Sequence, residues 1–396
     1  AGSWNLWRAQ VVGMGCCVSA LKVPNFGVNS SGERFDDKYD LGPLLGRGTY
    51  GIVKEARSVS DRSQFFAAKI VARELDTADP HKLKRKRLQE LVQRSKMQLA
   101  AHEQAILKSQ IQQLRAELRH LTSRMTEEDV RQEVAIMQEC RHERILELHD
   151  FFVSNVHFVL ILTMCYGSFE SMKPRSGWDD EDVPREHFRD LCRALEFVHS
   201  KRILHRDVKP QNMMLQADGS AVLCDMGLAA RLGDGQLRTV DVAGTPVFLP
   251  PDAYVLGQAT SSDMWAAGVT VYWLLFDKIP PFRFDGENQS ASAHRSSRRT
   301  FGGRRAKLAA SIASALRSVS QSLTGTKLGH ATSGHMAAQQ ISEALDRAFV
   351  DRCRPGRPAR SVKALSLVQS LLCIDHDRRP AATECLRDAW ISGAVD

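Results

Sequence analysis

The chain has 396 residues, of which 43% are apolar and 25% are charged, and its net charge is +8 at pH 7. These proportions are ordinary for a folded, water-soluble protein, and the length exceeds what one hydrophobic core usually supports, so we expect two packed lobes. The longest apolar run, residues 264–276, is shorter than the about 20 residues that a membrane-spanning helix needs. We therefore predict a buried core helix there.

The positive charge is concentrated in two segments. Residues 80–125 contain eleven Lys or Arg and three Glu, and residues 288–330 contain eight Lys or Arg and no acid, so each carries +8 and the rest of the chain sums to −8. A general nucleic-acid-binding fold would have a basic binding face in its body. We therefore expect no nucleic-acid partner.

The nine cysteines are scattered and form no Cys-x-x-Cys pair and no Cys/His cluster at zinc spacing. Reduced thiols in a cytosolic protein are the simplest interpretation. The expected location is therefore cytoplasmic, with membrane association and nuclear entry as alternatives that depend on the segments described below.

Strand signals dominate the first half of the chain. Residues 1–35 look irregular, and residues 39–71 and 145–165 show the alternation and turn residues of strands and hairpins. Between them, a basic insertion at about 76–128 has helical periodicity.

Helical signals dominate the second half, from residue 183 onward, apart from a loop-rich stretch at 203–262. Residues 285–335 form a second insertion, rich in Ser and Arg, whose composition predicts a flexible segment. A small β-rich lobe at 39–165 and a larger helical lobe at 166–392 would meet at a junction suited to a ligand cleft.

A glycine-rich stretch follows the first predicted strand. Its residues are Gly46, Arg47, Gly48, Thr49, Tyr50, Gly51, Ile52 and Val53. Glycines at this spacing let backbone N–H groups approach phosphate oxygens closely. A dinucleotide-binding fold requires a helix directly after such a loop, but here the sequence continues as a strand, which favours a hairpin covering the phosphates of a nucleotide.

Lys69 lies at the end of the next predicted strand, in the stretch Ala67-Ala68-Lys69-Ile70. A lysine placed after a glycine loop can reach the α- and β-phosphates of ATP, and it needs a carboxylate to hold it. Glu133 is the candidate carboxylate, because it lies on a predicted helix whose apolar face carries Val134 and Met137.

The most specific signal is the run His205-Arg206-Asp207-Val208-Lys209-Pro210-Gln211-Asn212, which fills every polar position of the pattern His-Arg-Asp-x-x-x-x-Asn. Asp207 can accept the proton of an attacking hydroxyl, Lys209 can neutralise the γ-phosphate, and Asn212 can hold a metal ion. Asp225, in Cys224-Asp225-Met226-Gly227, is the expected ligand of Mg²⁺ bridging the β- and γ-phosphates. These motifs predict ATP and Mg²⁺ as reactant and cofactor.

Together the motifs resemble the eukaryotic protein kinase family over about residues 39–392, with the two insertions as interruptions. Lys209, together with Gly244-Thr245 in the substrate loop, resembles serine/threonine kinases, and the core is most similar to the calcium/calmodulin-dependent and calcium-dependent group. The resemblance implies a bilobal α+β fold with a five-stranded small lobe and a mainly helical large lobe. It also implies transfer of the γ-phosphoryl group of ATP to Ser or Thr hydroxyls of protein substrates.

The alternative function is a catalytically weak pseudokinase that acts as a signalling scaffold. The long insertions would suit such a protein, but the polar residues of the catalytic motifs are intact. Those residues are Lys69, Glu133, Asp207, Asn212 and Asp225.

The resemblance further implies an adenine site and a stacked apolar column typical of the active state. The positions that match the adenine site are Val53, Ala67, Leu162, Met164, Cys165 and Met214, with Leu162 as the gatekeeper and residues 163–167 as the hinge. The positions that match the column are Met137, Leu148, His205 and Met226.

Four positions depart from the family pattern. Met226 replaces the Phe of Asp-Phe-Gly, and Thr163 begins the hinge where the family often has Glu. Pro250-Pro251-Asp252 replaces Ala-Pro-Glu, so the carboxylate that should face Arg379 is one methylene shorter. Glu170 is the nearest candidate for the ribose-binding acid, but it is displaced by one position. None of these changes removes a catalytic group.

Arg206 precedes the predicted base, and in many kinases such an arginine binds a phosphothreonine in the activation segment. Here the position three residues before Gly244 is Asp241, which is already negative, and the nearest phosphorylatable residue is Thr239. Asp241 is therefore either a built-in counter-ion for Arg206 or an ordinary solvated loop residue. The resemblance places Thr245 in the substrate loop.

The two insertions have several interpretations. The 76–128 insertion is a solvated helical extension, a nuclear-localisation or acidic-partner site centred on residues 82–87, or a basic amphipathic target for a calmodulin-like groove. The 285–335 insertion is a solvated linker or a site of serine phosphorylation next to arginines.

Residues 14–19, Met-Gly-Cys-Cys-Val-Ser, fit the N-myristoylation pattern. If Met14 is the true start of translation, Gly15 would be acylated, and Cys16 and Cys17 would be palmitoylation sites that supply the second anchor which stable membrane attachment requires. A chance match is the alternative.

Overall fold

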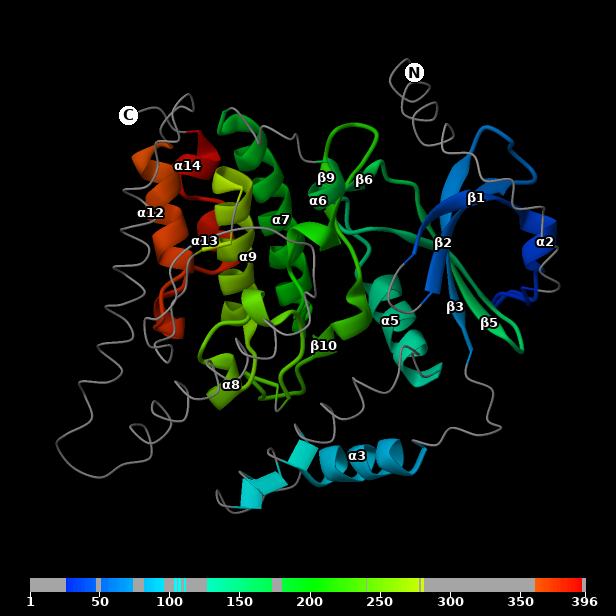
Figure 1. Cartoon of the computed structure of the whole chain (residues 1–396), viewed down its shortest axis with the longest axis horizontal. Helices are drawn as coiled ribbons and strands as arrows, with labels where there is room; N and C mark the ends of the chain where they lie inside the picture. The colour runs from blue at the N-terminus through cyan, green and yellow to red at the C-terminus, as the bar shows by residue number, and fades with distance from the viewer. Residues whose placement is uncertain are drawn as a thin grey trace, which may run out of the picture.

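The computed structural model describes residues 26–47, 51–73, 82–95, 127–172, 180–239, 241–277, 279–280 and 360–393, with short pieces at 103–104, 106–107 and 110–111. Figure 1 shows a sheet-rich lobe and a helical lobe side by side, with α5 (Glu127–Glu139) between them. The predicted bilobal α+β fold is confirmed.

The small lobe is built on a five-stranded antiparallel sheet in the order β1-β2-β3-β5-β4. The strands are β1 (Tyr39–Arg47), β2 (Gly51–Ser58), β3 (Phe65–Ala72), β4 (Leu148–Val153) and β5 (His157–Thr163). The predicted hairpins at 39–71 and strands at 145–165 correspond to these elements.

Both faces of this sheet are covered, which explains why residues 158–162 of β5 are all apolar. Phe158, Leu160 and Leu162 point to the core shared with α5 and the large lobe. Val159 and Ile161 alternate with them and join a second cluster on the other face. Alternation along the strand thus distributes one hydrophobic run between two cores.

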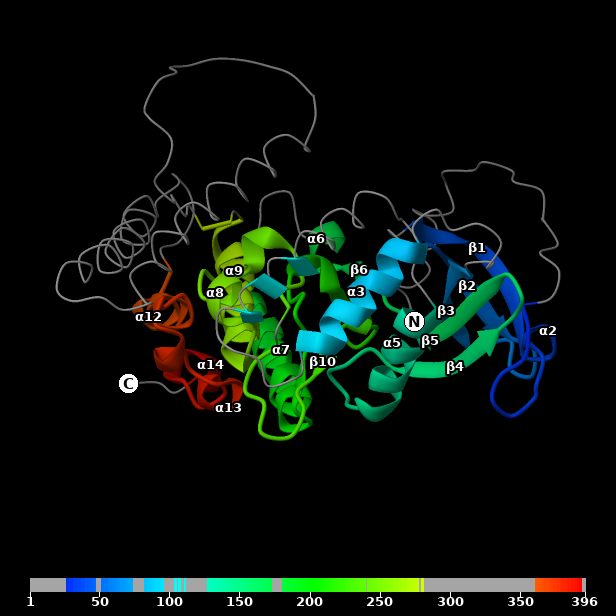
Figure 2. The same cartoon turned by 90° about the horizontal axis from the view of Figure 1, so that it is seen from below.

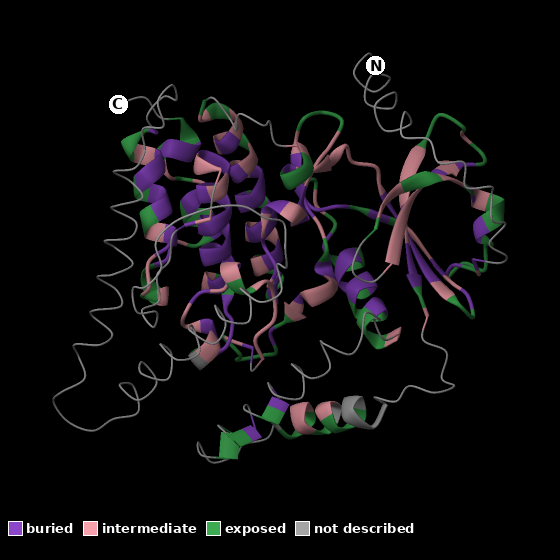
Figure 3. Cartoon of the chain, in the orientation of Figure 1, coloured by how far each residue is buried: buried purple, intermediate pink, exposed green. Residues whose placement is uncertain are grey.

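The large lobe is organised around α9 (Thr260–Phe276), which contains the predicted core helix. Almost every residue of α9 is buried, and α7 (Asp182–Ser200) and α12 (Val362–Leu371) pack against it (Figure 3). A Cβ atom on Gly268 of α9 would lie 2.8 Å from the Cβ of Leu371, so the absence of a side chain permits close approach of α9 and α12.

Short elements line the junction between the lobes and complete the large lobe. They are β6 (Gly167–Ser168), α6 (Phe169–Met172), β7 (Ile203–Leu204), η1 (Pro210–Asn212), β8 (Met213–Leu215), β9 (Ala221–Leu223), η2 (Met226–Leu228), β10 (Ala230–Arg231), η3 (Pro246–Phe248), α8 (Ala253–Leu256), η4 (His376–Arg378), α13 (Ala382–Cys385) and α14 (Ala389–Ser392).

A segment that we name the N-terminal strap, residues 26–38, covers the edge of β4 and ends in α2 (Phe35–Lys38). Val28 pairs with Val153 at that edge, and Phe26 and Phe35 are buried in the outer cluster. Residues 26–34 form no helix and no strand beyond isolated bridges, as the sequence predicted, but their packing against the sheet was not foreseen.

Asp150 of β4 connects the strap to the sheet through hydrogen bonds and an ion pair. Its carboxylate accepts hydrogen bonds from the Asn29 amide and the Tyr39 hydroxyl, both at 3.1 Å, and pairs with Lys38 at 2.7 Å. Burial first, and then the charge of Asp150, raises the pKa of Tyr39 to about 12, so the phenol stays a proton donor. The strap is thus fixed by both apolar and ionic contacts.

The basic insertion contributes α3 (Lys82–Ser95), which lies apart from α5 and below the two lobes in Figure 1 and is therefore in the foreground of the view from below (Figure 2). Further along the insertion, Leu107 and Ile111 are buried. The predicted flexible insertion at 285–335 and the lipidation pattern at 14–19 lie outside the described residues. In the part of the chain that the structure describes, no helix combines the length and apolar character needed to cross a bilayer.

The strap yields a test at Gly27, whose φ is +90° and where a Cβ atom would lie 1.8 Å from the carbonyl oxygen of Val153. Gly27→Ala should release the strap and speed hydrogen exchange of residues 26–38 and 148–156 by at least about tenfold, since each tenfold corresponds to about 1.4 kcal/mol of local opening free energy.

Gly32→Ala is the matched control, because Gly32 also has a positive φ of +80° but has open space around its Cβ position. Equal exchange rates in the two variants would show that the Gly27–Val153 approach does not hold the strap.

Candidate active site

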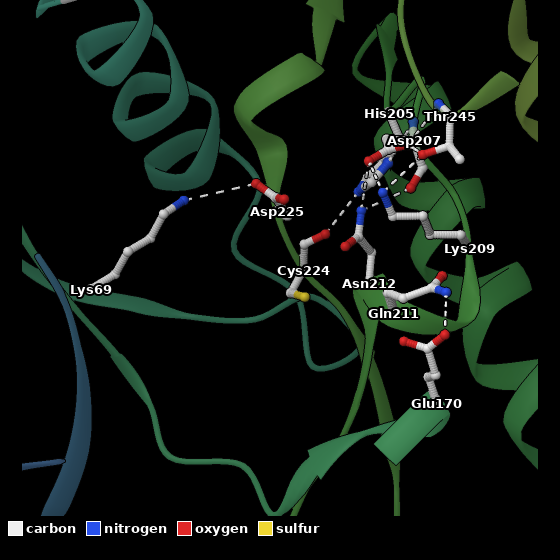
Figure 4. Close-up of polar contacts among 10 residues, drawn as sticks. All are labelled: Lys69, Glu170, His205, Asp207, Lys209, Gln211, Asn212, Cys224, Asp225 and Thr245. Carbon is white, nitrogen blue, oxygen red and sulfur yellow. Dashed lines mark hydrogen bonds and ion pairs between the residues drawn. The ribbon is translucent and has the colours of Figure 1, made fainter. Parts of the chain in front are cut away.

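The polar residues of the sequence motifs converge where the two lobes meet. β3 supplies Lys69, and the loop between β7 and η1 supplies Asp207 and Lys209. Asp225 immediately precedes η2, on the far side of Cys224 from the catalytic loop (Figure 4).

Lys69 is held by two carboxylates. Its Nζ lies 2.6 Å from Oε1 of Glu133 on α5, although the two residues are 64 positions apart in the sequence. The same nitrogen lies 3.8 Å from Oδ1 of Asp225. Asp225 reaches this position from a left-handed backbone conformation, with φ 67° and ψ 75°.

Burial would lower the pKa of Lys69, but the negative charges of Glu133 and Asp225 outweigh it and raise that pKa. Burial acts the other way on Glu133, whose side chain is 2% exposed, and raises its pKa against the effect of Lys69. The 2.6 Å contact favours an ionised pair. The charge of Asp225 stabilises the ammonium group of Lys69 and adds to the rise in the pKa of Glu133. Lys69 is therefore a fixed cation between α5 and the segment that carries Asp225.

Asp263, near the start of α9, binds the backbone of the catalytic loop. The Asp263 carboxylate accepts backbone N–H hydrogen bonds from His205 at 2.9 Å and Arg206 at 2.8 Å, and it contacts Nε2 of His199 at 2.9 Å. Burial favours protonation of Asp263, but the hydrogen bonds and the charge of His199 prevail and lower its pKa. An ionised buried carboxylate thus fixes the loop, including Arg206 at φ 66°.

His205 links this loop to the segment that contains Cys224 and Asp225. Its Nε2 lies 3.0 Å from the Cys224 carbonyl, and its Nδ1 accepts the backbone N–H of Asp207 at 3.2 Å. This pair of contacts assigns the proton to Nε2 and makes His205 a neutral spacer between Asp207 and Asp225. His205 is fully buried, as are the other three members of the predicted apolar column, Met137, Leu148 and Met226.

Asp207 sits at the centre of a compact polar cluster (Figure 4). Its Oδ2 is 2.6 Å from Lys209 Nζ and 3.1 Å from the Asn212 amide nitrogen. Its Oδ1 accepts from the Thr245 backbone N–H at 3.1 Å and from the Thr245 hydroxyl at 2.8 Å. Lys209 also donates to the Thr245 hydroxyl at 2.9 Å, so base, lysine and substrate loop form one unit.

Asn212 and Asp225 have the chemistry of a magnesium site. The Asn212 amide nitrogen donates to the backbone oxygen of Asp207 at 2.9 Å, which leaves its amide oxygen for another partner. The Asp225 side chain is 48% exposed. Carboxylate and amide oxygens are the hard donors that Mg²⁺ prefers.

The predicted adenine positions lie on paired strands. Val53 of β2 is in register with Lys69 of β3, and Ala67 is in register with Leu162 of β5. Met214, on β8 of the large lobe, pairs with Ser168 of β6. The structure therefore places these side chains on both lobes around the junction.

Met164 and Cys165 follow β5 and lead into the large lobe. Burial raises the pKa of the Cys165 thiol to about 12, so it remains protonated and unreactive. This cysteine therefore acts as a small apolar group in the hinge.

The ends of the glycine-rich hairpin are described, whereas Gly48, Thr49 and Tyr50 lie outside the described residues. Gly46 and Arg47 end β1, and Gly51 begins β2. A Cβ atom on Gly51 would lie 2.1 Å from the carbonyl oxygen of Ile70, so only glycine fits against β3 there.

Arg206 is engaged by the activation segment. Its Nη1 lies 2.8 Å from Oδ2 of Asp241, and its Nε donates to the Leu228 carbonyl at 2.6 Å. The Arg206 and Asp241 side chains are 10% and 24% exposed, so the pair is largely shielded from water. The solvated-loop interpretation of Asp241 does not fit these contacts.

Thr239, the alternative phosphorylation site, is buried, and its hydroxyl donates to the Asp241 carbonyl at 2.8 Å. Gln258 fixes the same segment, because its side-chain amide pairs with the backbone N–H and C=O of Ala243, both at 2.9 Å. Gln258 could not be identified from the sequence, since a single glutamine belongs to no recognisable motif.

The shortened carboxylate of Asp252 still meets Arg379, which donates to it and to the carbonyl oxygens of Cys373 and Ile374. Arg238 approaches the other Asp252 oxygen at 3.7 Å. Aspartate is thus tolerated in place of the family's glutamate, because the Arg379 side chain remains fully buried and paired with Asp252.

Glu170 does not behave as a clear ribose ligand. Its Oε1 accepts a hydrogen bond from the Gln211 side chain at 2.7 Å, and the pair is exposed at the edge of the catalytic loop (Figure 4). The one-position displacement seen in the sequence corresponds to this different contact.

Comparison with known proteins shows which family contains these site residues. The family model described as "Protein kinase domain" matches residues 109–391. That range includes Glu133 and the catalytic loop, while Lys69 and the first three strands precede it.

Among curated proteins, CBL-interacting protein kinase 10 from rice is 26% identical over 64% of this chain and 47% of its own length. CBL-interacting serine/threonine-protein kinase 15 from Arabidopsis thaliana is 33% identical over 39% of this chain and 37% of its own length. A protein named "Probable myosin light chain kinase" from Dictyostelium discoideum is 26% identical over 67% of this chain and 63% of its own length. The chain thus spans less than two thirds of each of these relatives.

Proposed function

Because this chain belongs to the protein kinase family, we propose that it transfers the γ-phosphoryl group of ATP to serine or threonine hydroxyls of protein substrates. The observation that carries the proposal is the cluster in which Oδ2 of Asp207 lies 2.6 Å from Lys209 and its Oδ1 lies 2.8 Å from the Thr245 hydroxyl. The names of related proteins, which include serine/threonine kinases, support the same acceptor class.

The reaction follows from the roles of these groups. The acceptor hydroxyl oxygen forms a bond to the γ-phosphorus, the bond from that phosphorus to the β–γ bridging oxygen breaks, and ADP leaves. Asp207 takes the hydroxyl proton, and Lys209 balances charge on the transferring group. Positioning and electrostatic stabilisation supply most of the catalysis.

Lys69 binds the α- and β-phosphates of ATP, and Glu133 fixes its ammonium group from behind. Asn212 and Asp225 would hold Mg²⁺, which supplies charge neutralisation at the phosphates when bound. The pseudokinase alternative has no support in this arrangement, because each of these side chains is present and placed at the cleft.

The ion pair between Arg206 and Asp241 gives this kinase a built-in counter-ion. A carboxylate has less charge and fewer oxygens than a phosphate, but one short charge-assisted hydrogen bond of 2.8 Å in a shielded position can order the segment. We propose that activity does not require phosphorylation of the activation segment.

The basic helix α3 and the lipidation pattern suggest where the enzyme acts. The cluster at residues 82–87 would attract an acidic surface, which is an anionic membrane, an acidic protein or a calmodulin-like groove. We favour the membrane, because acylation at Gly15 with palmitoylation at Cys16 and Cys17 would supply two lipid anchors and α3 a third, electrostatic contact. The proposed location is thus cytoplasmic and membrane-associated, with nuclear entry as the alternative.

Asp207→Asn should lower kcat by roughly 10²–10⁴-fold and leave the Kd for Mg-ATP within about twofold, because it removes proton acceptance without removing a nucleotide contact. Peptide phosphorylation and nucleotide titration measure the two effects. Asp234→Asn, in an exposed turn, is the control. A variant that keeps more than about a tenth of wild-type kcat would show that Asp207 is not the base.

Phosphatase-treated protein from bacteria should already phosphorylate peptides, and Asp241→Ala should reduce kcat/KM by about tenfold, since it leaves Arg206 unpaired. Thr239→Ala should cost less than about threefold, because it removes only neutral hydrogen bonds, to the Asp241 carbonyl at 2.8 Å and from the Gln258 backbone N–H at 3.3 Å. The reverse order of effects, with activity dependent on phosphate at Thr239, would exclude the built-in counter-ion.

A chain that begins at Met14 should incorporate myristate in cells and sediment with membranes, whereas Gly15→Ala should abolish both. Replacing Lys84, Lys86 and Arg87 by Gln should reduce binding to vesicles of anionic lipid by about tenfold or more, since each basic residue near the surface contributes about 1 kcal/mol. If the chain that begins at Met14 stays soluble and carries no myristate, the lipid anchor is excluded. If the Gln variant binds vesicles as well as the wild type does, α3 contacts a protein partner and not the membrane.

A further inference from the structure

The connection between Lys69 and its partner Glu133 is unusually long, because the basic insertion lies between β3 and α5. A short connection restrains the start of the following helix by its length alone, whereas a long loop restrains it very little. α5 must nevertheless be held in one orientation if Glu133 is to meet Lys69 at 2.6 Å. Another contact near the start of α5 has to supply that restraint.

Arg73, the residue immediately after β3, makes this contact. Its Nη2 lies 2.7 Å from Oε2 of Glu127, the first residue of α5, and the two are 54 positions apart in the sequence. We propose that Arg73 and Glu127 form a clasp that positions α5, and that the clasp tunes the affinity of the Lys69 site for ATP. The effect on catalysis rests on the proposed kinase function.

The Arg73 side of the clasp is fixed to the sheet. Its backbone N–H donates to the Val156 carbonyl at 2.8 Å, and its Nη1 donates to the Ser154 carbonyl at 3.0 Å. Its guanidinium also lies over the ring of the buried Phe158, 5.6 Å from the ring centre. An ordinary surface ion pair contributes little to stability, because ordering two long side chains costs conformational entropy and water screens the charges. Arg73 is already held by these three contacts, so pairing with Glu127 costs it little further conformational entropy.

The Glu127 side is fixed within α5. Arg131, one turn further along, contacts the other carboxylate oxygen of Glu127 at 2.8 Å. Hydrogen bonds from Arg131 and then Arg73 lower the pKa of Glu127, so the clasp stays ionised at neutral pH. A negative side chain at the first residue also suits the positive end of the helix dipole.

The clasp and the catalytic ion pair are two successive connections between β3 and α5. Glu127 and Glu133 are separated by about 9 Å along the helix axis at 1.5 Å per residue. A single contact would allow α5 to pivot about that point. Two contacts at different positions along the helix, at Glu127 and Glu133, fix its orientation relative to the sheet. α5 is also connected to the large lobe, by the Glu139–Arg231 pair at its other end and by Gln132 near its middle, which donates to the Ala229 carbonyl at 3.3 Å.

The test is a double-mutant cycle on the full chain. Arg73→Ala and Glu127→Ala should each raise the Kd for Mg-ATP by about three- to tenfold, and the double variant should be no weaker than the poorer single, because both remove the same contact. Hydrogen exchange of residues 127–139 should become faster in all three variants. KM for the peptide substrate should not change, because peptide and nucleotide contact different groups.

Arg62 and Asp40 provide the matched control, since they form an exposed ion pair in the same lobe between a loop and β1. Arg62→Ala and Asp40→Ala should leave nucleotide affinity and the exchange of α5 unchanged. Additive effects of Arg73 and Glu127, an unchanged Kd, or an equal rise in peptide KM would overturn the clasp. If the wild-type protein binds ATP but does not phosphorylate peptides, the proposed function is wrong. The Kd for Mg-ATP and the hydrogen exchange of α5 would still show whether the Arg73–Glu127 clasp positions that helix.

Discussion

The buried carboxylate of Asp263 is the contact on which the catalytic loop depends. It accepts the backbone N–H groups of His205 and Arg206 and the ring of His199, and it is fully enclosed by the large lobe. Without it two backbone donors would be buried without partners, each at a cost of about 1–3 kcal/mol, and the positive φ of Arg206 would lose its support. The orientation of Asp207 and of Arg206 follows from this one anchor.

The rest of the site is assembled by contacts between segments that are far apart in the sequence. Lys69 of the small lobe meets Glu133 of α5 and Asp225 of the large lobe, and Arg206 meets Asp241 of the activation segment. The Lys69 pairs lie where the two lobes meet, and the Arg206–Asp241 pair lies within the large lobe. In both places partial burial strengthens electrostatic attraction.

Sequence reasoning worked best where the chemistry is local or strongly patterned. Asp207, Lys209 and Asn212 lie within six positions, so the motif specifies the loop, and the partnership of Arg379 with Asp252 followed from the family pattern in spite of the shorter side chain. It failed where a residue has meaning only through its tertiary neighbours. Gln258, the strap around Asp150 and the Arg73–Glu127 pair belong to no motif, and Glu170 turned toward Gln211 because a one-residue displacement changes which neighbour a side chain meets.

The most direct measurement is phosphate transfer from Mg-ATP by the purified, dephosphorylated chain to a peptide library that contains serine, threonine or tyrosine as the sole acceptor. The cluster of Asp207, Lys209 and Thr245 leads us to expect phosphoserine and phosphothreonine products and no phosphotyrosine. Bound nucleotide without any phosphopeptide, or phosphotyrosine as the main product, would contradict the assignment of this site to a serine/threonine kinase.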